Sequence, residues 1–239
     1  MPNPYFQFKQ FTVYHDRCAM KVTTDACMFG AWVAQNLAQQ ENGDKSFLDI
    51  GTGTGLLSLM IAQQTQARID AIEIDPQAAA QATENIKASP WSDRINVITE
   101  DLHHFHPEKK YDQIISNPPF YEKEIPSASP GKQAAHHGEG LLLEELFDWV
   151  KNNMKQEGRF HALLPFKRKQ AIHTMLRKAG LFVEEWVEIK PTGKALPLRI
   201  LLRASLEKPL VVYESEEIIA IEGNDYSAFF RGLVKDYYL

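Results

Sequence analysis

The chain has 239 residues, of which 44% are hydrophobic and 24% are charged, and its formal net charge is −5 at pH 7. These values are typical of one globular domain with a full core, and they argue mildly against a dedicated non-specific nucleic-acid binder, which is usually basic. No apolar run approaches the roughly 18 residues of a membrane helix. The N-terminus lacks the basic and apolar stretches of a secretory signal. We therefore expect a cytoplasmic protein that does not associate with a membrane.

The cysteines and histidines do not form a recognisable metal-binding pattern. Cys18 and Cys27 are spaced neither as a zinc knuckle nor as a C-x-x-C redox pair, which indicates a reducing compartment. His103, His104 and His106 lie close together, but no acidic or cysteine residue is spaced to complete a metal site with them. We interpret these histidines as part of a polar loop and predict no bound metal.

The first predicted element is an amphipathic helix over residues 26–40. Either Thr24 or Asp25 is expected to cap it. The apolar residues that follow recur at the spacing of one buried helix face, and they are Met28, Phe29, Trp32, Val33 and Leu37. Whatever the function, this helix is predicted to pack on a sheet.

A strand, a glycine-rich turn and a helix follow. Residues 46–50 are an apolar strand, residues 51–55 read Gly-Thr-Gly-Thr-Gly, and a helix begins at Leu56. Glycines allow a sharp turn and the close approach of a ligand, and the helix N-terminus presents free N–H groups. A second strand over residues 68–74 carries Glu73 at the distance where an acidic side chain typically binds ribose hydroxyls. A turn of this kind could also be a simple connection, but with the acidic residue it favours a nucleotide-binding site formed by Gly51, Gly53, Gly55 and Glu73.

Strands and helices alternate through most of the remaining chain. Further strands are predicted over residues 95–98, 111–116, 159–164, 182–189 and 198–204, with helices from Pro76, over 141–154 and over 165–178. This alternation predicts an α/β fold with a mostly parallel sheet of seven strands and helices on both faces. Because no helix separates the last two strands, one of them is expected to be antiparallel. The tail has two short apolar runs, 210–213 and 218–221, before an aromatic helix that reaches Leu239.

Asn117, Pro118, Pro119 and Phe120 follow the strand at residues 111–116. Consecutive prolines cannot continue a strand, because each lacks an N–H and has a fixed φ, so the chain must leave the sheet here. Ligands bind at such carboxyl ends in open α/β sheets. An amide oxygen, a free carbonyl and an aromatic ring together suit a planar ring that carries an exocyclic NH2 group. The long segment that follows, residues 121–138, is expected to be a lid or a substrate-gripping loop.

Three separate stretches resemble one family over essentially the whole chain. Residues 8–11 with 20–25, residues 51–55 with 117–120, and residues 225–239 resemble motifs of the bacterial tRNA1(Val) (adenine-37-N6)-methyltransferases. The resemblance implies one Rossmann-like class I methyltransferase domain over residues 1–239, in which residues 1–44 cover the cofactor and residues 206–239 are an extension packed on the core. It also implies an enzyme that methylates adenine 37 of tRNA at N6 with S-adenosyl-L-methionine. We expect this enzyme to be a monomer.

The resemblance further implies roles for individual residues. Asn117, Pro118 and Phe120 are expected to be catalytic, and Asp101 to accept a hydrogen bond from the cofactor's adenine amino group, although it could also be a solvated turn residue. The expected cofactor-binding residues are Lys21, Thr24, Asp49, Gly51, Gly53, Gly55, Glu73, Asp101 and Asn117. One departure is His-His at residues 136–137, where the family has arginine before histidine. The candidates for RNA phosphate contacts, each of which could equally be a solvated surface residue, are Lys9, Arg17, Lys21, Lys167, Arg168, Lys169, Arg177, Lys178 and Lys190.

Other functions use the same Asn-Pro-Pro motif. Enzymes with this motif also methylate DNA adenine, guanine N2 in ribosomal RNA, or the glutamine amide in proteins. A DNA enzyme generally needs a large target-recognition region, for which 239 residues leave little room. A glutamine enzyme generally has tyrosine after the prolines and a helical domain in front. A non-catalytic RNA-binding module on the same fold is the alternative from a different class.

Overall fold

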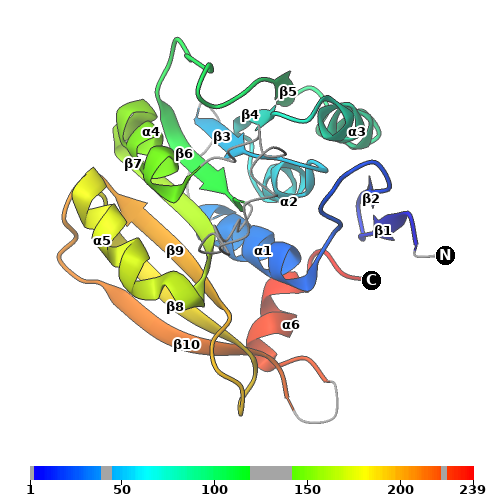
Figure 1. Ribbon diagram of the computed structural model, residues 1–239. Coiled ribbons are helices and arrows are strands. Elements are labelled where there is room, and N and C mark those ends of the chain that lie inside the picture. The colour runs from blue at the N-terminus through cyan, green and yellow to red at the C-terminus, as the bar shows by residue number, and fades with distance from the viewer. Residues whose placement is uncertain (1–2, 39–44, 119–141, 222–224) are drawn as a thin grey trace, which may run out of the picture.

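The computed structural model describes residues 3–38, 45–118, 142–221 and 225–239, and within them one large sheet forms the centre of the molecule (Figure 1). This sheet has eight strands in the order β10-β8-β9-β7-β6-β3-β4-β5. Neighbouring strands are parallel except where they pair with β9. The strands are β3 (Ser46–Ile50), β4 (Arg68–Glu73), β5 (Ile95–Thr99), β6 (Tyr111–Ser116), β7 (Met154–Pro165), β8 (Phe182–Thr192), β9 (Arg199–Ser205) and β10 (Tyr213–Ala220).

The predicted fold class is confirmed, but the described part of the sheet has eight strands rather than seven. The additional strand is β10, which pairs in parallel with β8 from Tyr213 opposite Glu185 to Ala220 opposite Thr192. Its sequence Tyr-Glu-Ser-Glu-Glu-Ile-Ile-Ala lacks the alternation of a half-buried strand. Charged residues suit an edge strand, because they discourage pairing with another chain.

Two short strands that the sequence analysis did not predict lie outside this sheet. β1 (Tyr5–Gln7) and β2 (Thr12–Tyr14) form an antiparallel ribbon. The residues that join them include Phe8, which is buried in the same core as α1. The Lys9 backbone N–H donates to the Tyr237 carbonyl at 2.8 Å, so the two ends of the chain are packed against each other.

Helices cover both faces of the sheet (Figure 1). One face carries α1 (Thr24–Ala38), α2 (Leu56–Gln64), α3 (Pro76–Lys87) and α6 (Ala228–Val234), and the other carries α4 (Leu143–Asn153) and α5 (Lys169–Ala179). The side chains of a strand point alternately to the two faces. Phe47 of β3 therefore packs in the core beneath α1, α2, α3 and α6, and Leu48 packs in the core beneath α4 and α5.

The starts of two helices differ from the predictions. Thr23 caps α1, rather than Thr24 or Asp25, because its Oγ1 accepts a hydrogen bond at 3.2 Å from the backbone N–H three residues further on. The helix predicted from residue 165 begins only at Lys169, after a 3-10 turn that follows the end of β7. Such shifts are small and leave the order of elements unchanged.

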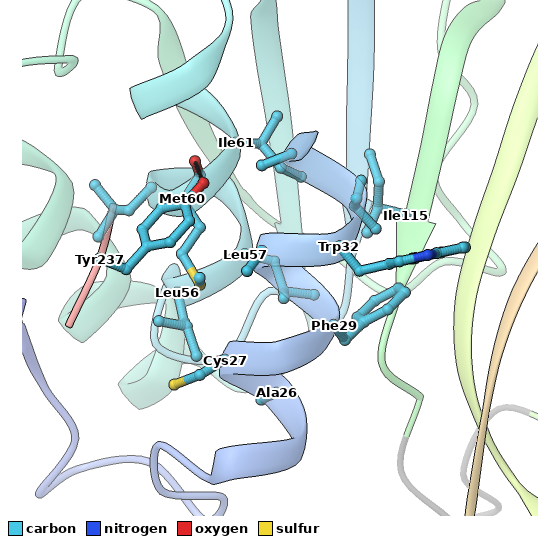
Figure 2. Packing of buried hydrophobic residues seen from close by; sticks show 14 of the residues in the cluster. Ala26, Cys27, Phe29, Trp32, Leu56, Leu57, Met60, Ile61, Ile115 and Tyr237 are labelled. Carbon is cyan, nitrogen blue, oxygen red and sulfur yellow. Dashed lines mark hydrogen bonds between the residues drawn. The ribbon is translucent and has the colours of Figure 1, made fainter. Parts of the chain in front are cut away.

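The helices α1 and α2 pack closely against each other (Figure 2). Trp32 of α1 and Leu57 of α2 belong to this contact. A Cβ atom on Gly30 would lie only 2.6 Å from the Met60 sulfur, so glycine permits the close approach. The Tyr237 hydroxyl donates to the Met60 carbonyl at 3.0 Å and attaches the C-terminal segment to the same helix. Because α2 begins directly after the glycine turn, this packing fixes the turn relative to the sheet.

Candidate active site

The carboxyl ends of neighbouring parallel strands meet at one edge of the sheet. Ile50 of β3 lies opposite Ser116 of β6, so the residues that follow them, Gly51 and Asn117, leave the sheet side by side. Strand β4 ends at the same level, at Glu73. Since neighbouring strands lie about 4.8 Å apart, the strand ends at Asn117 and Glu73 are separated by roughly 10 Å.

The strand order reverses at this edge. From β3 the chain moves outward through β4 and β5, and it then returns to β6 on the other side of β3. The connections that leave β3 and β6 therefore diverge, and in open α/β sheets ligands bind at such a switch point. The glycine turn and Asn117 flank it.

The glycine turn needs glycine because of its backbone conformation. Gly51, Gly53 and Gly55 have φ angles of 71°, 55° and 81°, in the left-handed region that other residues rarely adopt. A Cβ atom on Gly51 or Gly53 would meet no described atom within 4 Å, so open space adjoins their backbone. A ligand can therefore approach the main chain here, at the N-terminus of α2.

Glu73 holds the turn from the neighbouring strand. Its Oε2 accepts a hydrogen bond from the Gly53 N–H at 2.8 Å, and its Oε1 accepts from the Asp75 N–H at 3.0 Å. The side chain is only partly buried. Each carboxylate oxygen has a second lone pair, so Glu73 retains acceptor capacity for hydroxyl donors such as those of a ribose.

Asp49 lies buried beneath the turn. Its Oδ2 accepts from the hydroxyls of Thr52 at 2.7 Å and Ser58 at 2.8 Å, whereas its Oδ1 has no hydrogen-bond partner among the described residues. Burial raises the pKa of Asp49 to about 6, against the opposing effect of the two hydroxyl hydrogen bonds. Asp49 is fully buried, so it supports the turn from below rather than presenting an exposed carboxylate.

Asp101 follows β5 and is held by a nearby histidine. Its Oδ1 accepts from the His103 backbone N–H at 2.9 Å and lies 2.8 Å from the imidazole Nδ1. These hydrogen bonds lower the pKa of Asp101, with the backbone bond as the largest cause. Its Oδ2 accepts no hydrogen bond from the residues that the structure describes, and the side chain is 32% exposed. The carboxylate therefore keeps one oxygen for another donor.

Asn117 and Pro118 lie where the chain leaves β6. Pro118 is buried and Asn117 is half-buried. The Asn117 Oδ1 atom is itself buried, and no donor from the described part of the chain reaches it. Buried polar atoms are nearly always hydrogen-bonded. An unpartnered acceptor at the end of a strand is therefore a candidate for a hydrogen bond from a ligand.

Asn85 of α3 connects the N-terminal segment to the glycine turn through hydrogen bonds. The buried Asn85 side chain donates to the carbonyls of Tyr14 and Thr54, both at 2.9 Å, and accepts from the Tyr14 N–H at 3.0 Å. Burial raises the pKa of the Cys18 thiol to about 11, and the negative charges of Glu73 and Asp75 add to the increase. The segment after β2 therefore runs close to the carboxylate that holds the turn.

The start of α1 reaches the same edge on its other side. Asp25 forms an ion pair with Arg199 at 2.9 Å, and Arg199 lies opposite Pro165 at the carboxyl end of β7. Lys21 and Thr24 are both exposed on the stretch before this ion pair. The described residues show no hydrogen bond from either side chain to the glycine turn, although both lie on the segment that crosses this edge.

Several positioning residues were missed by the sequence analysis. Ser58, Asn85 and Ser116 bind backbone or side-chain atoms that are 9, 31 and 66 residues away in the sequence. No local pattern signals such contacts. His103 was interpreted only as a loop residue, yet its position two residues after Asp101 is a spacing at which a carboxylate commonly binds the backbone.

Some predicted residues lie outside the described ranges, and two further predictions concern membrane association and metal binding. Pro119, Phe120, the segment 121–138 and the His-His pair at 136–137 lie outside the described ranges. Among the residues described, no helix is both long and apolar enough to cross a membrane. The same residues contain no group of three histidine, cysteine or acidic side chains that could hold a metal ion.

The order of the strands and the helices on both faces of the sheet give the Rossmann-like fold of class I S-adenosylmethionine-dependent methyltransferases. The structure superimposes with a TM-score of 0.63 on a predicted O-methyltransferase from Agrobacterium tumefaciens, at 17% identity and covering 88% of this chain and 95% of that one. It also matches a glycopeptide N-methyltransferase complexed with S-adenosyl-L-methionine, with a TM-score of 0.56 at 11% identity, covering 77% of this chain and 95% of that one.

Sequence comparison identifies the family within this class. Residues 30–178 match the model of the methyltransferase small domain family. The chain is 38% identical over 241 residues to the tRNA1(Val) (adenine(37)-N6)-methyltransferase of Parabacteroides distasonis, a match that covers 100% of this chain and 99% of the relative. The chain belongs to the tRNA1(Val) (adenine(37)-N6)-methyltransferase family, and its cofactor is S-adenosyl-L-methionine.

Proposed function

We propose that this protein transfers a methyl group from S-adenosyl-L-methionine to the exocyclic N6 of adenine 37 in tRNA1(Val). The observation that carries the proposal is the buried Asn117 Oδ1, which has no donor among the described residues and belongs to a residue that leaves the sheet next to Gly51. A buried unsatisfied acceptor costs about 1–3 kcal/mol, a cost that a substrate amino group can offset. The name of the Parabacteroides relative, a tRNA1(Val) (adenine(37)-N6)-methyltransferase, supports the choice of a tRNA adenine.

The residues at the edge fit the proposed cofactor. The open backbone of Gly51 and Gly53 gives room for its amino-acid end, and Glu73 has acceptor capacity for ribose hydroxyls. Asp101 offers one free carboxylate oxygen to the adenine amino group. Asp49 acts indirectly by holding the turn. Lys21 and Thr24 come from the segment over residues 1–44, which we propose covers the bound cofactor, while residues 206–239 form an extension packed on the core.

Positioning and electrostatics are sufficient for the proposed chemistry. The cofactor supplies a methyl group activated by a positively charged sulfur. An adenine amino group is a weak nucleophile, because its lone pair is delocalised into the ring. If Asn117 Oδ1 and the Pro118 carbonyl accept hydrogen bonds from its two N–H groups, the lone pair can turn toward the methyl group, and both acceptors stabilise the positive charge that develops on nitrogen. The methylated nitrogen would then release one of its protons to solvent. Phe120 would stack on the adenine ring.

At the carboxyl ends of the strands, acidic residues lie on one side of Asn117, where we propose that the cofactor binds, and basic residues lie on the other side, where we propose that RNA binds. Glu73, Asp75 and Asp101 lie at the ends of β4 and β5. On the other side of Asn117, Lys167 and Arg168 follow β7, and no described acidic residue pairs with either. We propose that these two residues, with Lys21, contact tRNA phosphates.

Most of the other basic candidates have partners or lie elsewhere. Four of them form ion pairs with nearby glutamates, and these are Arg17 with Glu84, Lys169 with Glu188, Lys178 with Glu144, and Lys190 with Glu216. The Lys9 ammonium donates to the Lys235 carbonyl. Arg177 lies near the far end of α5, away from the strand ends.

The glutamates of β10 discourage edge pairing, which supports a monomer. A tRNA substrate implies a cytoplasmic enzyme.

The proposal is tested by incubating wild-type protein and Asn117→Ala with total small RNA and methyl-labelled cofactor. Digestion to nucleosides should yield labelled N6-methyladenosine with the wild-type protein. Asn117→Ala should lose at least 100-fold in turnover, on the scale seen when a single transition-state hydrogen-bonding group is removed. Calorimetry should show that the variant still binds the cofactor product S-adenosyl-L-homocysteine.

Other outcomes would contradict parts of the proposal. Label on guanine, or on protein alone, would overturn the substrate. A wild-type protein that binds RNA but transfers no label would indicate a binding module. Equal turnover of wild type and Asn117→Ala would remove Asn117 from the reaction.

A further inference from the structure

His103 lies between two carboxylates that belong to different elements. Its Nδ1 is 2.8 Å from Asp101 Oδ1, in the turn after β5, and its Nε2 is 3.3 Å from Glu145 Oε2, in the first turn of α4. Glu145 Oε2 also accepts from the Leu142 N–H at 3.0 Å, so it is held at the start of its helix. The imidazole therefore joins the end of β5 to α4.

Both partners of this imidazole are acceptors, and this determines its charge. A neutral imidazole has one N–H donor, whereas an imidazolium has two. Only the protonated ring can donate to Asp101 and Glu145 at once, and these two carboxylates raise the pKa of His103. They are the charged groups that face the ring, one from the turn after β5 and one from α4.

The hydrogen bonds to Asp101 are unevenly distributed between its two oxygens. Oδ1 receives both the backbone N–H and the imidazole of His103, and Oδ2 receives no hydrogen bond from any described residue. Two bonds to one oxygen restrict rotation of the carboxylate. The free oxygen is thereby held in one orientation, at the end of the strand where the cofactor's adenine is proposed to bind.

We propose that His103 is a positioning residue for the cofactor. It holds Asp101 so that Oδ2 accepts from the adenine amino group, and Glu145 orients the imidazole that does so. This inference rests on the proposed cofactor role of Asp101. His103 does not touch the substrate or the transferred methyl group, so its effect should appear in cofactor affinity.

The test measures binding of two ligands to the full-length protein by calorimetry. One is S-adenosyl-L-homocysteine and the other is S-inosyl-L-homocysteine, in which a carbonyl replaces the amino group. His103→Ala should weaken the adenosyl ligand about three- to tenfold, the net effect expected for one typical hydrogen bond, and should leave the inosyl ligand unchanged. His106→Ala is the matched control, because His106 is also exposed and its side chain has no hydrogen bond to a described residue; it should change neither affinity.

Comparison with Asp101→Asn separates this inference from the function itself. Asp101→Asn should reduce the preference for the adenosyl ligand. If it does so while His103→Ala weakens both ligands equally or neither, the positioning role is wrong and the cofactor assignment stands. If Asp101→Asn leaves the preference unchanged, the cofactor role of Asp101 and the inference both fail.

The titration of His103 gives a second readout that a purely structural role would not produce. The ring proton signals of His103, followed by NMR in the unliganded full-length protein, should report a pKa above the ordinary value of histidine. Glu145→Gln should lower that pKa. In the wild type the affinity for S-adenosyl-L-homocysteine should decline as pH rises through the His103 pKa, and in Glu145→Gln the decline should begin at lower pH. An affinity that follows no such shift would contradict the proposal.

Discussion

The Ser116 hydroxyl donates a hydrogen bond to the Ile50 carbonyl at 2.9 Å. This bond joins the last residue of β6 to the last residue of β3, immediately before Asn117 and Gly51 leave the sheet. Both groups are buried, and the backbone pairing of the two strands ends at the same level. The bond therefore fixes the separation between the catalytic candidate and the glycine turn.

Removal of this hydroxyl should affect turnover more than folding. We expect Ser116→Ala to reduce the free energy of unfolding by about 1 kcal/mol, the usual net contribution of one hydrogen bond. Because the bond orients Asn117, kcat should fall while the KM for tRNA changes little. Ser116→Thr retains the hydroxyl and is the comparison variant. The expectation is wrong if Ser116→Ala has the kcat of the wild type.

The Asn85 side chain should be the main attachment of the N-terminal segment. Asn85→Ala removes two hydrogen bonds to Tyr14 and one to Thr54. The expected cost is about 1–3 kcal/mol, because the variant leaves buried backbone groups without partners. Hydrogen exchange should show lost protection over residues 12–17, and the Kd for the cofactor should rise. Gln77→Ala, an exposed change on the same helix, is the control. Unchanged exchange in Asn85→Ala would show that other contacts hold this segment.

The buried Asp49 should make stability depend on pH in an unusual direction. Its pKa is raised to about 6 by burial, so between pH 4 and 6 the folded state binds more protons than the unfolded state. Stability contributed by protonated Asp49 is therefore present at low pH and lost as pH rises through this window. Asp49→Asn should abolish this loss, which is on the order of 2 kcal/mol, while its amide oxygen still accepts from Thr52 and Ser58.

The measurement is the difference in free energy of unfolding between Asp49→Asn and the wild type, followed from pH 4 to 8 without cofactor. A difference is required because Asp16, Asp101 and Asp112 have lowered pKa values and lose stabilisation in acid in both proteins. The difference should grow in favour of the variant as pH rises. A constant difference would mean that Asp49 is ionised throughout this range.

Lys167 and Arg168 should contribute to tRNA binding through charge alone. The double variant Lys167→Ala/Arg168→Ala should raise the KM for tRNA and reduce the slope of log KM against log salt by about one to two, since each phosphate contact adds about one to the slope. Arg177→Ala/Lys178→Ala, at the other end of α5, removes the same charge and should change neither quantity. Similar effects from both double variants would indicate only a general effect of net charge.

The sequence alone determined the succession of strands and helices between residues 46 and 205, the glycine turn and the end of β6 at the Asn-Pro-Pro motif. These are local properties, because apolar periodicity, left-handed glycine conformations and the missing N–H of proline act within a few residues. The edge strand β10 was missed for the same reason: with three glutamates, it becomes a strand only by pairing with β8.

The tertiary structure decided which side chains meet. Ser116 reaches Ile50, Asn85 reaches the glycine turn, and His103 lies between Asp101 and Glu145. Strand pairing and helix packing bring the residues of each contact together. The local sequence does not specify how far apart these residues lie in the folded protein. The residue types needed for methyl transfer can be read from the chain, but their mutual positions depend on the register of the sheet.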